Sequence, residues 1–127
     1  MKIVFLDRDG VINIDKNYLF KIEDFEFNDG IFELLRGLLL LDYKLVIITN
    51  QSGIGRGYYK ESDLIKLHKW VDNIFRKEKI DIYRYLFCPH TPSDNCNCRK
   101  PNIGMINEIK NDFIIDLENS WIIGDKE

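Results

Sequence analysis

The chain has 127 residues, of which 45% are hydrophobic and 31% charged, and its net charge is −3. This length and composition predict one globular domain, residues 1–127, with a hydrophobic core. The weak negative charge argues against nucleic-acid binding, which needs a concentrated positive surface, and no apolar run reaches the roughly 20 residues of a membrane span. A charge follows the amino terminus too early for a signal peptide, so we expect a cytoplasmic protein with reduced thiols.

The first third of the chain predicts a strand, an irregular excursion and a helix. Residues 2–6 (KIVFL) form a short apolar run typical of a buried parallel strand. Residues 10–30 are too polar for the core and predict a turn and a hairpin. Residues 31–41 favour a helix, with Asn28 or Asp29 available as its cap.

The rest of the chain continues to alternate. Residues 62–78 give the clearest helix, because apolar residues recur there at helical spacing and Ser62 can cap it. A further helix is expected after Asn102. Strands are predicted at residues 44–49, 83–88 and 120–124. Strands that alternate with helices indicate an α/β fold with a parallel sheet covered on both faces.

Polar residues follow three of these strands. They are Asp7-Arg8-Asp9, residues 49–52 (TNQS) and residues 124–126 (GDK). In an open parallel sheet, ligands bind just beyond the carboxyl ends of the strands. We therefore expect the three polar ends to meet at one cleft.

Asp7 and Asp9 are two residues apart, so an extended backbone projects their carboxylates to the same side. Two such carboxylates repel each other unless a cation lies between them, and a hard divalent ion with oxygen ligands, Mg²⁺, fits this requirement. Asp125 supplies a third carboxylate at another strand end. The arrangement can hold a phosphate through the metal and leave one aspartate to attack phosphorus.

All three cysteines and one of the two histidines fall within residues 88–98. The four side chains are Cys88, His90, Cys96 and Cys98. Three thiolates and an imidazole suit a closed, tetrahedral, structural Zn²⁺ site, and unrelated thiols are the alternative. A redox pair is disfavoured because no Cys-x-x-Cys begins a helix. The metal would fix a long loop and deliver Arg99 and Lys100 to the cleft.

These motifs resemble the haloacid dehalogenase superfamily of phosphatases. The matching residues are the DxDG of Asp7 to Gly10, Thr49, Lys100 and the Gly124-Asp125 pair. The resemblance implies a three-layer, Rossmann-like α/β fold without a cap domain. It also implies that Asp7 is the nucleophile and Asp9 the general acid and base, with Thr49 and Lys100 holding the phosphoryl group. Mg²⁺ would bind the Asp7 carboxylate, the Asp9 backbone carbonyl and Asp125.

The stretches FLDRDGVIN, NQSGIGRGYY and CPH…CNCRKPNIGM narrow the resemblance. They are similar to D-glycero-D-manno-heptose 1,7-bisphosphate 7-phosphatases and to histidinol-phosphate phosphatases, and NQSGIGRG favours the heptose type. The implied activity is Mg²⁺-dependent removal of the 7-phosphate through an aspartyl-phosphate, in nucleotide-activated heptose biosynthesis that can feed lipopolysaccharide. A histidinol-phosphate phosphatase and an inactive zinc-binding relative remain alternatives.

The same resemblance implies contacts to a small phosphorylated sugar. We also expect a monomer. The implied substrate contacts are Arg8, Asp15, Lys16, Asn17, Tyr18, Asn50, Gln51, Ser52, Arg99 and Lys126. We expect His68 to be a surface or half-buried residue without a role. Because members of this family continue past the GD motif, we also expect that the chain is shortened after Glu127.

Overall fold

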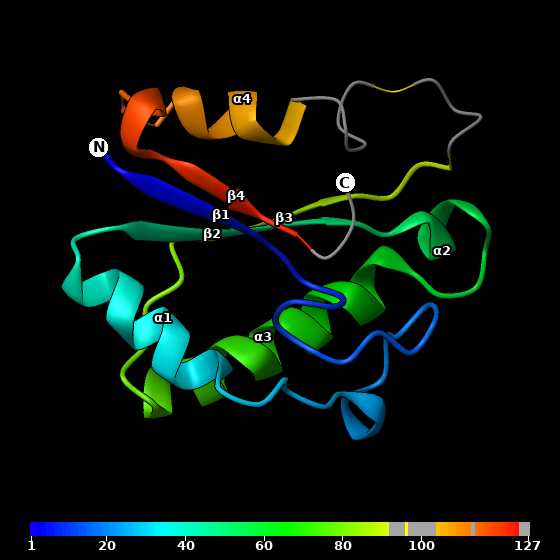
Figure 1. Ribbon diagram of the computed structural model, residues 1–127. Coiled ribbons are helices and arrows are strands. Elements are labelled where there is room, and N and C mark those ends of the chain that lie inside the picture. Colours follow the sequence, from blue (N-terminus) through cyan, green and yellow to red (C-terminus); the bar gives the residue numbers. More distant parts are fainter. Residues whose placement is uncertain (92–95, 97–103, 113, 125–127) are drawn as a thin grey trace.

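The computed structural model describes residues 1–91, 96, 104–112 and 114–124. Its centre is a four-stranded parallel sheet in the order β3-β2-β1-β4 (Figure 1). The strands are β1 (Ile3–Asp7), β2 (Lys44–Asn50), β3 (Arg84–Cys88) and β4 (Trp121–Ile123). All four strands predicted from the sequence are confirmed.

Helices cover both faces of this sheet, which confirms the three-layer α/β fold. The helices are α1 (Ile31–Leu40), α2 (Ser52–Gly55), α3 (Glu61–Lys77) and α4 (Gly104–Lys110), with short 3₁₀ turns at η1 (Ile22–Asp24) and η3 (Leu117–Asn119). In Figure 1, α1 and α3 lie below the sheet and α4 lies above it. Among the described residues, no helix combines the length and apolarity that a membrane crossing requires.

The two faces of the sheet have separate hydrophobic cores. Val4, Leu6 and Leu45 belong to the core that includes α1 and α3. Their neighbours Ile3 and Phe5 belong to the core that includes α4. Alternate residues of each strand are thus buried on opposite faces, which explains why the strands read as continuous apolar runs.

Both predicted helix caps are wrong. α3 begins one residue before Ser62, and Asp63 accepts a hydrogen bond of 2.9 Å from the backbone N–H of Lys60. α1 begins after Gly30, whose φ of 78° is left-handed and suits glycine. Asn28 instead donates its side-chain amide to two carbonyl oxygens of the loop that follows β1.

The segment 10–30 makes the antiparallel pairing of a hairpin, at Asn13 and Phe27, but it is not the polar excursion that its composition predicts. Ile12, Leu19 and Phe25 are buried in the core beside α1 and α3. Because these residues have no regular spacing, neither a helical nor a strand pattern reveals them. The segment therefore closes one side of the sheet next to the end of β1.

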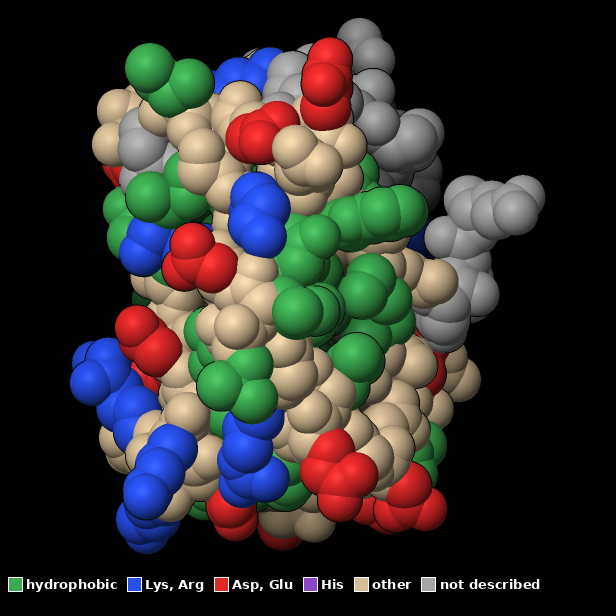
Figure 2. All heavy atoms as spheres, turned by 60° about the vertical axis from the view of Figure 1, so that its left-hand side comes forward, with side chains coloured by type: hydrophobic (Ala, Val, Ile, Leu, Met, Phe, Trp, Pro, Cys, Tyr) green, Lys and Arg blue, Asp and Glu red, His purple; other side chains and the backbone are tan. Residues whose placement is uncertain are grey.

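The left end of the molecule in Figure 1 has a mixed surface. Turned forward, this face shows hydrophobic side chains among basic and acidic residues (Figure 2). Large hydrophobic side chains of the chain that are mostly exposed include Leu40 on α1 and Trp121 on β4, which is 62% exposed. Trp70 differs, because it packs against Phe25 in the core.

Candidate active site

The carboxyl ends of the central strands meet at one edge of the sheet, as predicted. Asp7 is the last residue of β1 and pairs with Ile48, while Asn50 ends β2 opposite Cys88 of β3. The register that pairs Leu6 with Ile123 carries the end of β4 to the same edge. Four predicted site residues, Arg99, Lys100, Asp125 and Lys126, lie outside the described residues, as does the predicted zinc ligand Cys98.

The loop after β1 turns sharply back over this edge. The carbonyl oxygen of Arg8 accepts hydrogen bonds from the backbone N–H groups of Val11, Ile12 and Asn13, at 3.2, 2.8 and 3.2 Å. Gly10 has a φ of 94°, in the region that glycine adopts without strain. The turn holds the backbone of Asp9 directly beyond the end of β1.

The carboxylate of Asp9 is held by four hydrogen bonds. Its Oδ1 accepts from Arg8 Nη2 at 2.8 Å, Arg8 Nε at 3.2 Å and Asn13 Nδ2 at 3.0 Å. Its Oδ2 accepts from Gln51 Nε2 at 3.1 Å. The Asp9 side chain is 23% exposed, so it is oriented from within the protein and still reaches the surface.

The predicted role of Arg8 as a substrate contact stays a prediction, although Arg8 is buried. Its side chain is 1% exposed, and besides Asp9 it binds the Leu19 carbonyl oxygen at 3.1 Å and lies 3.2 Å from His68 Nε2. A guanidinium group uses its donors in fixed directions, and these are directed to partners inside the protein. Arg8 therefore supports Asp9 instead of facing solvent.

His68 is buried, so the prediction of a surface or half-buried residue is wrong. Because a guanidinium can only donate, Nε2 of His68 accepts from Arg8, which requires a neutral ring with its proton on Nδ1. Burial, together with the positive charge of Arg8, lowers the pKa of His68 to about 3. His68 thus acts as an internal acceptor that completes the bonding of Arg8.

Gln51 is also a predicted substrate contact, and its side chain faces the protein interior and is 3% exposed. The amide nitrogen donates to Asp9 Oδ2 and, at 2.9 Å, to Thr49 Oγ1, while the amide oxygen accepts from the Tyr59 hydroxyl. Both N–H donors are therefore used. Gln51 connects Asp9 with Thr49 and has no donor left for a substrate.

The loop of residues 15–18 carries the other predicted contacts after β1. All four of these residues, Asp15, Lys16, Asn17 and Tyr18, are exposed. Asn17 and Tyr18 have φ values of 51° and 53°, a left-handed conformation that is unusual for two consecutive residues other than glycine. The ring of Tyr18 meets that of Tyr58 edge to face at 4.8 Å, which brings this loop against the segment after α2.

Two further predicted contacts lie at the end of β2. Asn50 is its last residue and Ser52 is the first residue of α2, and both are partly exposed. They therefore border the same edge as Asp7 and Asp9.

Three of the four predicted zinc ligands lie together. The ligand atoms of Cys88, His90 and Cys96 all lie within 4.8 Å of one another. Cys88 Sγ is 3.4 Å from His90 Nδ1 and 3.4 Å from Cys96 Sγ. Tetrahedral zinc with bonds of about 2.0–2.3 Å separates neighbouring donors by roughly 3.3–3.8 Å. The spacing of these three side chains is therefore compatible with a zinc site, which stays a prediction.

The cysteine cluster is bonded directly to the edge that carries the carboxylates. The backbone N–H of Gln51 donates to the Cys88 carbonyl oxygen at 2.8 Å, and that of Gly55 donates to the Pro89 carbonyl oxygen at 2.9 Å. A Cβ atom at Gly55 would lie only 2.7 Å from the Pro89 oxygen, so glycine permits this approach. Any metal bound to the cluster would thus stabilise the strand ends beside Asp9.

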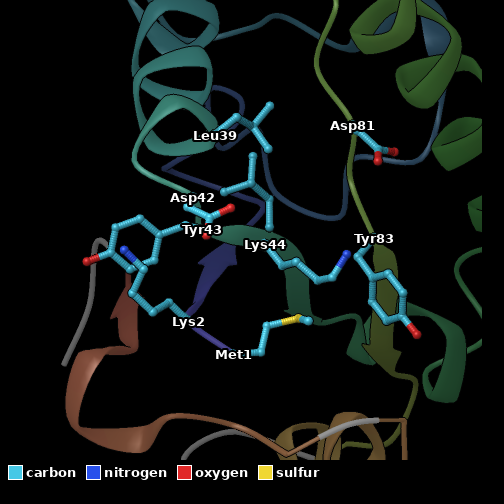
Figure 3. A pocket seen from close by; sticks show the side chains of 9 residues that line it. Met1, Lys2, Leu39, Asp42, Tyr43, Lys44, Asp81 and Tyr83 are labelled. Atoms are coloured by element: carbon cyan, nitrogen blue, oxygen red, sulfur yellow. The ribbon is translucent and has the colours of Figure 1, made fainter.

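A cavity of about 470 Å³ lies at the opposite edge, near the amino ends of the strands (Figure 3). It is lined by Met1, Lys2, Leu39, Asp42, Tyr43, Lys44, Leu45, Asp81 and Tyr83. The ammonium groups of Lys2 and Lys44 lie over the rings of Tyr43 and Tyr83, at 4.6 and 5.2 Å from the ring centres. Its position separates it from the carboxylate site.

Comparison with known proteins identifies the relatives of this chain. A family model described as polynucleotide kinase 3 phosphatase matches residues 2–126. A D-glycero-alpha-D-manno-heptose-1,7-bisphosphate 7-phosphatase of Campylobacter jejuni is 56% identical over 98% of this chain and 71% of its own length. A D-glycero-beta-D-manno-heptose-1,7-bisphosphate 7-phosphatase of Helicobacter pylori is 49% identical over 99% of this chain and 73% of its own length.

A solved structure agrees with these relatives. The D,D-heptose 1,7-bisphosphate phosphatase of B. bronchiseptica, complexed with magnesium and phosphate, matches with a TM-score of 0.89 and 32% identity, over 99% of this chain and 71% of that one. The family model is named for polynucleotide substrates, but near-complete matches at 49–56% identity are the more specific result. The chain therefore belongs to the haloacid dehalogenase-like phosphatases and, among them, to the family of the D-glycero-D-manno-heptose-1,7-bisphosphate 7-phosphatases.

Proposed function

We propose that this protein is a Mg²⁺-dependent phosphatase that removes the 7-phosphate of D-glycero-D-manno-heptose 1,7-bisphosphate. One observation supports the proposal most directly. The carboxylate of Asp9 is held by hydrogen bonds just beyond β1, which ends in Asp7, and Gln51 links it to Thr49. Relatives named for this reaction match nearly the whole chain. A phosphatase of this kind would supply a step of nucleotide-activated heptose biosynthesis.

The oxygen donors at this edge suit magnesium, which prefers carboxylate and carbonyl ligands. We propose that Asp7, the backbone carbonyl of Asp9 and Asp125 hold it, in keeping with the solved relative that was complexed with magnesium and phosphate. When bound, magnesium would neutralise charge on the phosphoryl oxygens. Zinc, held by Cys88, His90, Cys96 and Cys98, would serve only to fix the loop.

Two aspartates divide the proposed chemistry. A carboxylate oxygen of Asp7 attacks phosphorus, and the bond between phosphorus and the C7 oxygen breaks as Asp9 donates a proton to that oxygen. Asp9 then takes a proton from water, whose oxygen attacks the aspartyl-phosphate. The bond between phosphorus and Asp7 breaks, and inorganic phosphate leaves with Asp7 and Asp9 restored.

The remaining residues would bind and orient the substrate. Thr49 Oγ1 already accepts from Gln51, so its own hydroxyl proton can be donated to a phosphoryl oxygen. We propose that Lys100 neutralises the same group. The proposed contacts to the sugar and its second phosphate are Asp15, Lys16, Asn17, Tyr18, Asn50, Ser52, Arg99 and Lys126. We further propose a cytoplasmic monomer that does not act on nucleic acid.

The test is phosphate release by the full chain from both anomers of D-glycero-D-manno-heptose 1,7-bisphosphate, with Mg²⁺ and with EDTA. We expect release of the 7-phosphate only with Mg²⁺, and its loss in Asp7→Asn, because an amide is a poor nucleophile. Mass spectrometry of the quenched wild-type reaction should show one phosphoryl group on the peptide that contains Asp7.

Two competing substrates make this test specific. Histidinol phosphate represents the other resemblance, and an oligonucleotide with a 3′-phosphate represents the name of the family model. Higher kcat/KM on either of these than on the heptose bisphosphate would contradict the proposed substrate. Absence of release from all three would contradict the proposed activity.

A further inference from the structure

We propose that Tyr59 is a positioning residue for the reaction, because its hydroxyl fixes the side chain of Gln51 and thereby the direction of Asp9 Oδ2. This inference deepens the proposed phosphatase function and rests on it for its kinetic consequence. The hydrogen-bond chain itself, from Tyr59 through Gln51 to Asp9, can be tested without a substrate.

The first step concerns the orientation of the Gln51 amide. Its nitrogen faces the Asp9 carboxylate at 3.1 Å, and its oxygen faces the Tyr59 hydroxyl. A reversed amide would place an oxygen against a carboxylate, which repels it, so only one orientation is stable. Burial raises the pKa of Tyr59 to about 12, and the phenol therefore keeps the proton that it donates at neutral pH.

The second step identifies the oxygen of Asp9 that is free to exchange a proton. Among the described residues, Oδ1 accepts three hydrogen bonds, two from Arg8 and one from Asn13, whereas Oδ2 accepts one, from Gln51. A carboxylate oxygen offers about two lone-pair sites, so the proton of a general acid has room only on Oδ2. Gln51 thus contacts the atom that would transfer the proton.

The third step shows that the position of Tyr59 is built into the fold. Its ring stacks on Phe20 at 4.9 Å, and Tyr59 is 6% exposed. A Cβ atom at Gly53 would lie 2.2 Å from Tyr59 Cε1, so only glycine allows the ring to pack there. Tyr59 is therefore held firmly enough to orient Gln51.

The kinetic test compares Tyr59→Phe with Tyr58→Phe on the full chain. Both substitutions remove a hydroxyl and keep the ring, but Tyr58 is 57% exposed and lies outside the hydrogen-bond chain. We expect Tyr59→Phe to lower kcat about tenfold with little change in KM, in line with the loss of one hydrogen bond. Tyr58→Phe should leave kcat unchanged, and an unchanged kcat in Tyr59→Phe would overturn the proposal.

A double-mutant cycle distinguishes positioning from a general structural role. If Tyr59 acts through Gln51, Tyr59→Phe should have no further effect on kcat once Gln51 is alanine. Equal effects in both backgrounds would overturn the proposal. Thermal unfolding of each variant shows whether the fold is retained.

An NMR measurement on the ligand-free protein keeps this inference separate from the proposed function. We expect the side-chain N–H₂ resonances of Gln51 to shift in Tyr59→Phe and to stay in place in Tyr58→Phe. Resonances that do not move would contradict the hydrogen-bond chain even in an active enzyme. If they move while the wild type releases no phosphate from any substrate, the chain of hydrogen bonds stands and the proposed function fails.

Discussion

At the scale of single residues, the carboxylate that we propose to give and take a proton depends on the groups that hold it. Asp9 is held on one side by Arg8, which is in turn bonded to His68. Such a buried cation is stabilised only if its donors are satisfied, because an unpaired buried charge is strongly unfavourable. His68, which lies on α3, therefore supports the site indirectly, as the neutral hydrogen-bond acceptor for Arg8.

The buried His68 predicts how stability depends on pH. Its pKa of about 3 lies below the value of 6.5 that an unfolded chain has, so the unfolded state binds the proton first as the pH falls. Its contribution is complete above pH 6.5 and is lost as the pH falls towards 3. The groups that face the ring are Arg8, Asp9 and Tyr85, and all remain in a His68→Gln variant.

Urea unfolding at pH 7 and pH 5 measures this effect. Between these values the wild type should lose about 2 kcal/mol more than His68→Gln, whose amide keeps an acceptor for Arg8. The exposed His90 is present in both proteins, so any contribution it makes is the same in both. Equal losses in the two proteins would mean that His68 takes up a proton as easily in the folded state as in the unfolded one.

Alanine substitutions at two glycines are expected to change the stability of the fold in opposite directions. Gly53→Ala would place a Cβ 2.2 Å from the Tyr59 ring, whereas a Cβ at Gly37, inside α1, meets nothing within 4 Å. We expect Gly53→Ala to destabilise the fold by about 1–3 kcal/mol through overpacking. Gly37→Ala should stabilise it by about 0.5–1 kcal/mol, because alanine loses less backbone entropy. Chemical denaturation of both variants checks the pair, and equal shifts would contradict the packing of Tyr59.

At the scale of elements, the loop after β3 is joined to the end of β2 through the carbonyls of Cys88 and Pro89. We expect the purified chain to hold one zinc ion. His90→Ala should weaken zinc binding by more than about tenfold. His90→Cys should retain the metal, because four thiolates are also a structural zinc set. Zinc content and chelator competition measure both variants.

Equal zinc affinity in the wild type and His90→Ala would contradict a metal at this cluster.

A kinetic measurement separates a structural role of the metal from a catalytic one. If zinc only fixes the loop, replacing it with Cd²⁺, which also takes four thiolate and imidazole donors, should leave kcat nearly unchanged. A large change in kcat would place the metal in the chemistry.

The elements themselves were predictable because their patterns are strong. Parallel strands buried on both faces read as unbroken apolar runs, and the buried stripe of α3 recurs at helical spacing. The strand ends, and with them Asp7, Asp9 and Thr49, follow directly from this alternation. By contrast, Ile12 and Leu19 lie in the core but follow neither helical nor strand spacing. The burial of their segment could therefore not be predicted from the sequence.

The supporting residues of the site were hidden for a different reason. Tyr58 and Tyr59 are neighbours of the same type, yet one is 57% and the other 6% exposed. A charged residue between two aspartates, Arg8, suggests exposure, and only its partners His68 and Leu19 reveal that it is buried. Motif spacing identifies groups that react, whereas tertiary contacts determine which groups hold them in place.

At the scale of the whole molecule, both hydrophobic cores share the strands β1 and β2. Adjacent residues of β1, such as Val4 and Phe5, contribute to opposite cores. Loss of the sheet would therefore expose both cores at once. We propose on this ground that residues 1–127 unfold as one cooperative domain.

The two tryptophans allow this to be measured at separate places. Trp70 packs in the core below the sheet, and Trp121 lies on the edge strand β4. In Trp121→Phe the remaining Trp70 reports unfolding of the core. In Trp70→Phe the remaining Trp121 reports unfolding of β4. For each variant, far-ultraviolet circular dichroism provides an internal reference for unfolding of the whole chain. We expect the fluorescence and dichroism midpoints in urea to coincide in each variant, with m near 1–3 kcal/mol/M. An earlier fluorescence transition at Trp121 would show that β4 separates from the sheet before the core unfolds, and would contradict a single cooperative domain.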